Sequence, residues 1–230
     1  MPAGLTIWND GGTVQITDSL VNPVLIQKGT ITTVTNTQAG APEAASMASF
    51  SYTRPNSSTY PMLAIRPSGL TGLTGIGFVE NGTPTSLTWV WDFLSTQAVG
   101  TTIDYWLFDL KPTPTSSKLF EIYDTAGNLA FSLAEKPMRI RSVLTGTLTS
   151  PLTSTTTFDS GRTYASLLTR WTERLLYRAL PNNTQQFLLG VAGATNGVQI
   201  GSFLLVATPG DSTPTLFGDY QVVVMDVTNY

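Results

Sequence analysis

The feature that most constrains this chain is an internal repeat. Residues 7–16 read Ile-Trp-Asn-Asp-Gly-Gly-Thr-Val-Gln-Ile, and residues 122–131, 115 positions later, read Ile-Tyr-Asp-Thr-Ala-Gly-Asn-Leu-Ala-Phe. Each segment has an apolar-aromatic-Asx start, a turn that contains glycine, and then apolar residues at alternate positions. Asx and Gly supply the backbone geometry of tight turns, and alternation gives a strand one buried face. Each segment therefore predicts a β-hairpin.

The repeat continues along both halves of the 230-residue chain. Pro23-Val24 matches Pro137-Met138, and residues 29–32 match residues 146–149. Near the two ends, Trp106-Leu107-Phe108-Asp109-Leu110 matches Val223-Val224-Met225-Asp226-Val227. The last two matches share an offset of 117, which predicts one small insertion in the opening region. A repeat of domain size indicates two copies of one β unit.

We therefore expect an all-β fold with two similar antiparallel β-sandwich domains produced by an internal duplication. The expected domains are residues 1–112 and 119–230, because the Pro-, Thr- and Ser-rich segment 113–118 has the composition of a short extended linker. Residues 5–35 and 120–150 should share one topology, with a long strand over 24–34 and a bulge at Lys28-Gly29.

One segment of the second half allows two structures. Residues 163–168 are expected to be a strand, because Met47-Ala48-Ser49-Phe50 aligns with Tyr164-Ala165-Ser166-Leu167 at the offset of 117. Residues 169–180 fit a helix or a strand, so at most one short helix is expected. Arg170, Arg174 and Arg178 recur at intervals of four within it, and they suggest either an anion contact or a solvated face.

Composition excludes several functional classes. The net charge of −3 argues against nucleic-acid binding, which requires clustered Lys and Arg. The chain has no Cys and no His, so it lacks thiolate sites, histidine-based catalysis and the commonest metal ligands. We expect no enzyme activity, no catalytic residue, no metal and no cofactor, although a carboxylate-pair hydrolase stays as a minor alternative. No segment has the length and apolarity of a transmembrane helix, and no secretory signal is recognisable at the N-terminus.

The surface chemistry indicates assembly. Only 12% of the residues are charged, against about 25% in typical soluble domains, and Thr, Ser, Gly and Pro take their place. Thr favours pleated, half-buried surfaces, which again points to β structure. A surface this poor in charge is typical of permanent assemblies.

The apolar patterns of three strands identify candidate core and contact residues. In Leu87–Phe93 the large residues, including Trp89 and Trp91, share one face, which predicts a core face; the alternative is a sugar-stacking platform formed with Trp106. Residues 103–110 and 222–227 are apolar on both faces, so each strand must be covered on both sides. The second cover is the sister domain, another subunit or a long loop. The candidates for a subunit interface are Trp106, Phe108, Val223 and Met225.

Several segments resemble a family of bacteriophage tail-region proteins, most of them without an assigned activity. The segments are residues 1–12, residues 120–132 with Lys136-Pro137-Met138-Arg139, residues 158–165, and the terminal Met225-Asp226-Val227-Thr228. They comprise 41 of the 230 residues and are spread over the length of the chain. The resemblance implies a virion component at the tail tip or tail fibre and carries over no catalytic residue.

The expected function is therefore that of a structural protein of a phage tail, in the tail tip, baseplate or tail fibre, with a contribution to host receptor binding. Its expected partners are other tail proteins, further copies of itself in a trimer or ring, and a bacterial surface receptor. Its expected location is the virion, after synthesis in the host cytoplasm. The alternatives are a glycan-binding or glycan-degrading module and a capsid decoration or head-closure protein.

Overall fold

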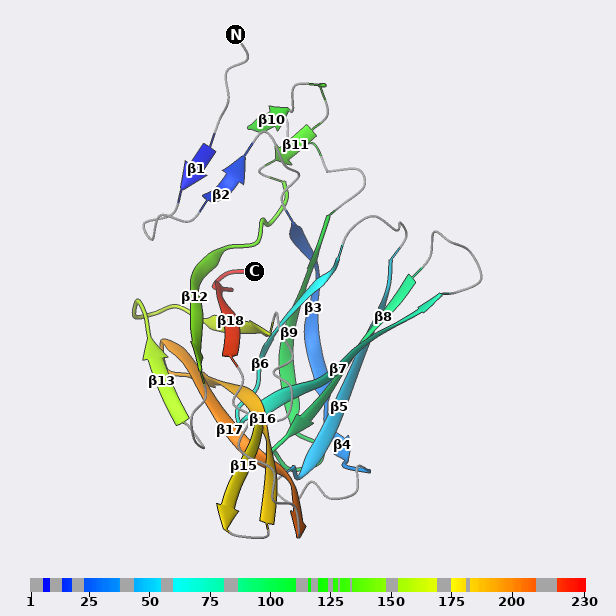
Figure 1. The fold of residues 1–230 in the computed structure, drawn as a ribbon. Helices are drawn as coiled ribbons and strands as arrows, with labels where there is room; N and C mark the ends of the chain where they lie inside the picture. Colours follow the sequence, from blue (N-terminus) through cyan, green and yellow to red (C-terminus); the bar gives the residue numbers. More distant parts are fainter. Residues whose placement is uncertain are drawn as a thin grey trace.

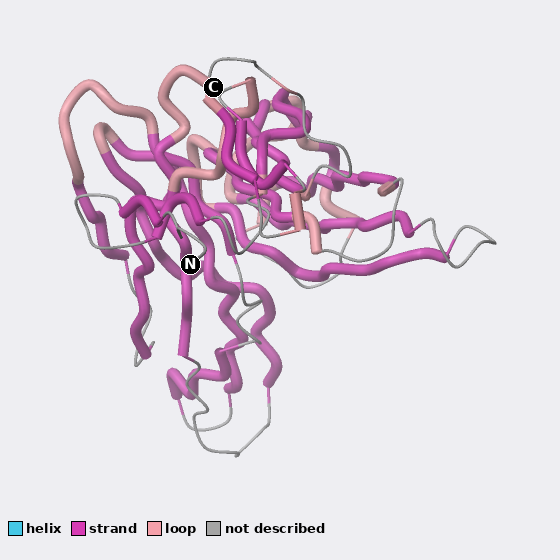
Figure 2. Tube along the Cα trace, turned by 90° about the horizontal axis from the view of Figure 1, so that it is seen from above, coloured by secondary structure: helices cyan, strands magenta, loops and turns pink. Residues whose placement is uncertain are grey.

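The structure is a computed structural model that describes residues 6–8, 14–17, 23–37, 44–54, 60–80, 87–110, 116, 120–123, 126–127, 129–132, 134–147, 153–168, 175–180, 183–209 and 219–230. Every regular element in these residues is a β-strand, as Figure 2 shows, which confirms the all-β expectation. All strand pairings between these elements are antiparallel. The described part of the chain contains no helix with the length and hydropathy needed to cross a membrane.

Two small hairpins lie side by side at one end of the molecule, beyond the large sheets (Figure 1). The first pairs β1 (Thr6–Trp8) with β2 (Val14–Thr17), and the second pairs β10 (Glu121–Tyr123) with β11 (Leu129–Ser132). Both have an irregularity at the same place in the repeat, between Ile7 and Trp8 and between Ile122 and Tyr123. The two hairpins predicted from the repeated motif are therefore present, and β2 contacts β11.

The first large sheet has six strands in the order β12-β18-β14-β6-β9-β3. The strands are β3 (Val24–Thr32), β6 (Met62–Arg66), β9 (Thr102–Asp109), β12 (Ile140–Thr147), β14 (Tyr164–Leu168) and β18 (Asp219–Asp226). Three of these strands come from each half of the chain, and the halves meet at β6 and β14.

The second large sheet has eight strands, with β13-β17-β16-β7-β8-β5-β4 in order and β15 pairing with β16 off this path. The strands are β4 (Val34–Thr35), β5 (Ser46–Thr53), β7 (Thr71–Glu80), β8 (Leu87–Ser95), β13 (Thr153–Thr157), β15 (Leu175–Leu180), β16 (Asn183–Ala194) and β17 (Gly197–Pro209). Here the halves meet at β7 and β16.

The two halves repeat the same pairings. In the first half β9 lies between β3 and β6, and β8 lies between β5 and β7; in the second half β18 lies between β12 and β14, and β17 lies between β13 and β16. The agreement extends to irregularities, because the ladder of β3 with β9 shifts between Leu25 and Gln27, and that of β12 with β18 shifts between Ile140 and Ser142. These positions are 115 residues apart, the same offset as the hairpins.

This register corrects three details predicted from the sequence. The bulge of β3 lies at Ile26 rather than at Lys28-Gly29. Gly29 and Gly146 are not equivalent, because an offset of 115 persists through β3 and β12, whereas β9 and β18 are offset by 117; residues 148–149 lie outside the described residues. The counterpart of β14 is β6 and not β5, since β5 belongs to the other sheet.

Each large sheet contains strands from both halves, so the two expected sandwich halves are joined edge to edge (Figure 1). The two sheets enclose one main core, and that core draws on both halves, with Ile65 and Trp91 from the first and Val191 and Val222 from the second. Burial of this kind is the main favourable contribution to folding. The predicted linker 113–118 lies outside the described residues except for Ser116.

The ambiguous segment of the second half is a strand wherever it is described. Residues 164–168 form β14, as expected, and residues 175–180 form β15. Residues 169–174 lie outside the described residues. The first half shows no counterpart of β15 among its described strands, so β15 is an addition to the repeated pattern.

Candidate functional site

The outer face of the six-stranded sheet carries a second apolar cluster, and the four predicted interface residues lie in it. Trp106 and Val223 are each 9% exposed, and Phe108 and Met225 are fully buried. The cover comes from the chain itself, through Val227 and Tyr230 of the C-terminal segment and the partly buried Met138. Met62 and Ile140, on β6 and β12 of the sheet, pack against the same cluster. The intramolecular alternative therefore accounts for these residues, and they are not available as an exposed subunit interface.

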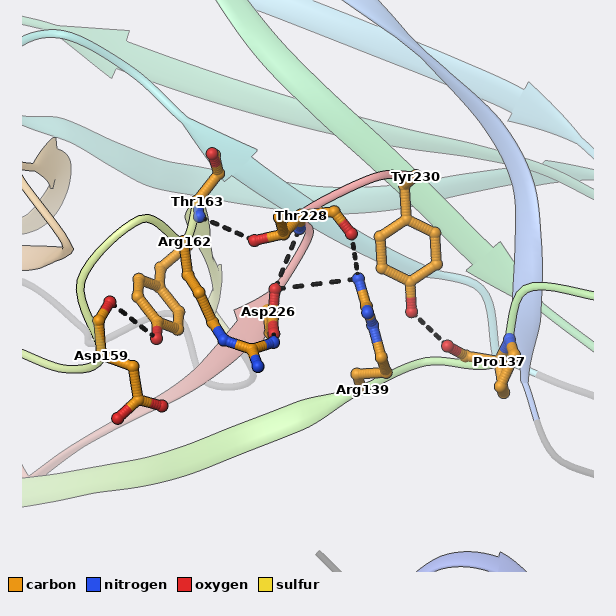
Figure 3. Close-up of polar contacts among 9 residues, drawn as sticks. Pro137, Arg139, Asp159, Arg162, Thr163, Asp226, Thr228 and Tyr230 are labelled. Carbon is orange, nitrogen blue, oxygen red and sulfur yellow. Dashed lines mark hydrogen bonds and ion pairs between the residues drawn. The ribbon is translucent and has the colours of Figure 1, made fainter.

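The C-terminal segment is held over this face by a polar group that we call the clasp: Arg139, Arg162, Asp226, Thr228 and Tyr230 (Figure 3). Arg162 Nη1 donates to Asp226 Oδ2 at 2.5 Å, and the backbone N–H of Thr228 donates to Asp226 Oδ1 at 2.9 Å. Arg139 Nη2 lies 3.7 Å from Asp226 Oδ1 and donates to the backbone oxygen of Thr228. One carboxylate therefore connects two arginines to the last turn.

The loop before β14 completes the clasp through backbone groups. The N–H of Thr163 donates to Thr228 Oγ1 at 2.8 Å, and the N–H of Val227 donates to the carbonyl of Thr163 at 2.9 Å. These bonds extend the antiparallel pairing of β14 and β18 beyond the strand ends. They fix the direction in which residues 227–230 leave the sheet.

Tyr230 anchors the end of the segment. Its hydroxyl donates to the carbonyl of Pro137, its ring lies edge-on to Phe108 at a centroid distance of 5.6 Å, and Arg139 Cζ lies 4.5 Å from its ring centroid. Lys28 Nζ, on β3 of the first half, donates to the backbone oxygen of Tyr230. Burial raises the pKa of the Tyr230 hydroxyl, although Arg139 opposes this effect. The end of the second half is thus bonded to the first half.

The protonation of Asp226 fits this arrangement. Burial by itself would raise the pKa of its carboxyl, but the hydrogen bonds from Thr228 and Arg162 outweigh burial, and the pKa lies below its usual value. The group is therefore an anion that accepts bonds at both oxygens. It holds the clasp together through the hydrogen bonds that it accepts from Arg162 and Thr228.

A cavity of about 170 Å³ lies beside the clasp. Its lining is Glu135, Lys136, Pro137, Arg139, Thr228, Asn229 and Tyr230. An apolar cavity of about 150 Å³ admits one benzene molecule, so this volume suits a small chemical group rather than a drug-sized ligand. In the part of the chain that the structure describes, no cluster of three or more Asp or Glu side chains could hold a metal ion.

The first half contains a counterpart of the clasp pair that sequence reasoning missed. Arg54 Nε donates to Asp109 Oδ2 at 2.8 Å, and the N–H of Leu110 donates to Asp109 Oδ1 at 2.8 Å. Asp109 and Asp226 occupy the same place in the repeat, and each binds an arginine that precedes β6 or β14. The difference is burial: Arg54 and Asp109 side chains are 4% and 2% exposed, whereas Arg162 is 48% exposed. The sequence signal that could have identified this pair is the shared position of Asp109 and Asp226 in the repeated motifs that end the two halves.

The remaining predicted residues fall into three groups. Trp91 is 4% exposed in the main core, as expected, and Trp89 is only partly buried against it. Arg178 lies on β15 with Thr184 as its Cα partner, so it belongs to a strand and not to a helical row. Arg170 and Arg174 lie outside the described residues, and the proposed anion contact stays a prediction.

Three segments that carry the phage resemblance meet at the clasp. Pro137 and Arg139 come from the segment 136–139, Arg162 and Thr163 come from the segment 158–165, and Asp226 and Thr228 come from the segment 225–228 (Figure 3). They are distant in sequence and become one hydrogen-bonded unit only in the folded chain.

Comparisons with protein-family models, with curated proteins and with solved structures found no match to this chain.

Proposed function

We propose that this chain is a structural protein of a bacteriophage tail, located in the tail tip, baseplate or tail fibre. The observation that carries the proposal is that the segments resembling phage tail proteins fold into two structural units, the paired hairpins and the clasp. The first unit contains β1–β2 and β10–β11, and the second contains Arg139, Arg162 and Asp226. A resemblance confined to turns scattered over the surface would give less support.

The chemistry of the described residues also supports a scaffold. Its buried carboxylates, Asp109 and Asp226, are both occupied by arginines and backbone donors. The second hairpin presents aromatic side chains to solvent, because Tyr123 on β10 is 52% exposed and Phe120, directly before β10, is 43% exposed. Exposed aromatics of this kind are common at protein contacts. The hairpin end is therefore the surface that we assign to contact with neighbouring tail proteins.

The test is the location of the protein in particles. Virions of the phage that encodes the chain are purified, separated into heads and tails, and probed by mass spectrometry and immunogold labelling. We expect labelling at the distal tail and a copy number that is a multiple of three, since tails have three-fold or six-fold symmetry. Labelling of heads would favour the decoration or head-closure alternative, and absence from particles would contradict the proposal.

Glycan binding is a second candidate, and one observation favours it. Tyr60 is 79% exposed and its ring lies edge-on to Trp89 at a centroid distance of 5.4 Å. Trp89 in turn stacks on the buried Trp91 at 6.2 Å, so the exposed ring has a rigid support. Tyr60→Ala should abolish binding to purified host surface polysaccharide in a pull-down, whereas Tyr123→Ala, at the hairpin end, should leave it unchanged. Equal binding by both variants would contradict this candidate.

A further inference from the structure

The two halves of the chain meet along a seam that we define by its strand pairs. In the six-stranded sheet, Ala64 pairs with Leu167 and Ile65 pairs with Ser166; in the eight-stranded sheet, Thr71 pairs with Val191. All six residues are buried, between 0% and 6% exposed. The seam is therefore part of both the backbone ladders and the core.

The seam has an approximate two-fold axis. Ala64 pairs with Trp106 within the first half, and Leu167 pairs with Val223 within the second half. Trp106 and Val223 occupy the same position in the repeat, so Ala64 and Leu167 are equivalent positions. These equivalent residues face each other in an antiparallel pair, which is the arrangement of a self-complementary interface between two like subunits.

The seam differs from the ladders within each half in the number of backbone pairs. The pairing of β3 with β9 includes eight Cα pairs and that of β5 with β8 another eight, whereas β6 with β14 has two and β7 with β16 has one. Opening the seam breaks these few ladder pairs and keeps each half's own ladders. It also breaks other bonds between the halves, including the backbone bonds of Gly193 to Pro67, Leu25 to Lys136 and Met138 to Pro23 and the bond of Lys28 to Tyr230. It also exposes apolar side chains such as Ile65, Leu167 and Val191, so an opened half is stable only when its seam is covered again.

We propose that the seam is an exchangeable interface, and that the partner it fits is the seam of a second copy of this chain. In the exchanged form, β6 and β7 of one chain pair with β14 and β16 of another. Reciprocal exchange closes a dimer, and head-to-tail exchange closes a ring, with no new contact in either case. The inference rests on the seam geometry and holds whether or not the protein belongs to a phage tail.

Protein concentration decides between the closed monomer and the exchanged form. The two halves are covalently connected, which gives each an effective concentration toward the other on the order of millimolar, so the monomer dominates in dilute solution. Exchange should therefore increase as the protein concentration approaches that value. Deleting residues 113–118 should increase it further, because the shorter connection holds the two halves of one chain less easily in register.

The absence of cysteine from the sequence allows a direct test. One full-length chain carries Thr71→Cys and a second carries Val191→Cys, and the two are refolded together at increasing concentration and then oxidised. Cα atoms of directly opposite antiparallel residues are about 4.5–5.5 Å apart, within the range of a disulfide. We expect a disulfide-linked heterodimer whose share grows at least about tenfold between about 10 μM and 1 mM.

Three controls keep the result interpretable. A single chain with both substitutions must form an intrachain disulfide, which shows that the bond fits. A mixture of Thr30→Cys and Asp104→Cys, opposite and exposed within the first half, reports random oxidation. If the first seam pair impairs folding, Ala64→Cys with Leu167→Cys replaces it.

The proposal is overturned if the seam mixtures give no more heterodimer than the Thr30 and Asp104 mixture, including in chains that lack residues 113–118. Such a result would leave the proposed tail function untouched, because that function is tested on particles. Failure to find the protein in virions would equally leave the seam result standing.

Discussion

The two halves of this molecule have the same strand pairings, but the ion pair at the end of β9 and the ion pair at the end of β18 differ in their exposure to solvent. In the first half, Asp109 and Arg54 form an ion pair that is almost fully buried. In the second half, Asp226 binds the exposed Arg162 and also Arg139, and a C-terminal segment covers the adjacent sheet face. The aspartate has the same position in both halves, because the strand pairings are the same. We expect its ion pair to contribute differently to the free energy of unfolding in each half, because the two pairs differ in burial.

The largest expected effect tests whether the halves unfold together. Trp91→Ala removes a ring from the core that both halves share, and we expect a loss of about 3–5 kcal/mol in the free energy of unfolding. Chemical denaturation followed by tyrosine fluorescence and circular dichroism should show one transition. Val143→Ala, on β12 and 46% exposed, is the control and should change stability by less than about 0.5 kcal/mol. A native melting temperature, or two separate transitions, would contradict the shared core.

The next prediction compares the two arginines. Arg54→Ala leaves Asp109 buried without its ion-pair partner, which should cost about 3–5 kcal/mol. Arg162→Ala should cost clearly less, because Arg162 is half-exposed, and solvent and Arg139 still stabilise Asp226. Urea denaturation of the two variants side by side measures the difference. Equal losses in the free energy of unfolding would show that burial does not make the Arg54–Asp109 pair more important for stability than the Arg162–Asp226 pair.

Two glycines on either side of the seam give a smaller contrast. A Cβ at Gly72 would lie 2.4 Å from the carbonyl oxygen of Leu189, and backbone there cannot move aside. A Cβ at Gly190 would lie 3.0 Å from the ring of Phe203 and 3.2 Å from the backbone nitrogen of Thr71. We expect Gly72→Ala to cost about 1–3 kcal/mol and Gly190→Ala to cost less. Thermal unfolding of both variants decides the order, and the reverse order would place the tighter side of the seam in the second half.

The smallest effect concerns pH and the clasp. The pKa of Tyr230 is raised in the folded chain by burial, so the neutral hydroxyl is favoured by folding. Its contribution is fully present below the unfolded value of about 10 and is lost as pH rises through the folded pKa. Wild type should therefore lose more stability than Tyr230→Phe between about pH 9 and 11. Parallel losses in the two proteins would show that Tyr230 does not titrate with unfolding.

Much of the secondary structure was readable from the sequence because it depends on local chemistry. The Asx-Gly turns predicted both hairpins, and the alternation in Leu87–Phe93 predicted the core position of Trp91. The double-sided apolar pattern of β9 and β18 correctly required cover on both faces. Periodicity reports which faces of a strand are buried, and it does so without reference to the partner.

The register of the strands and the choice of neighbouring strand were harder to predict from the sequence. Gly29 and Gly146 looked equivalent, yet the structure places them two positions apart in the repeat, although each lies against a tyrosine, Tyr105 and Tyr220. A short motif such as Gly-Thr-x-Thr fits several registers, and only the ladder with the neighbouring strand selects one. The same limit explains why β14 was matched with β5 instead of β6.

The sequence by itself determined the all-β class, the repeated unit, the strands that needed two covers and the unusual scarcity of charge. The tertiary structure alone decided that the halves share both sheets, that the chain covers Trp106, Phe108, Val223 and Met225 itself, and that Arg139, Arg162 and Asp226 meet. The physical reason is the distance along the chain over which each interaction acts. Turn geometry and alternation act over a few residues, whereas the choice of covering partner depends on the total apolar area and hydrogen bonds that distant segments satisfy together.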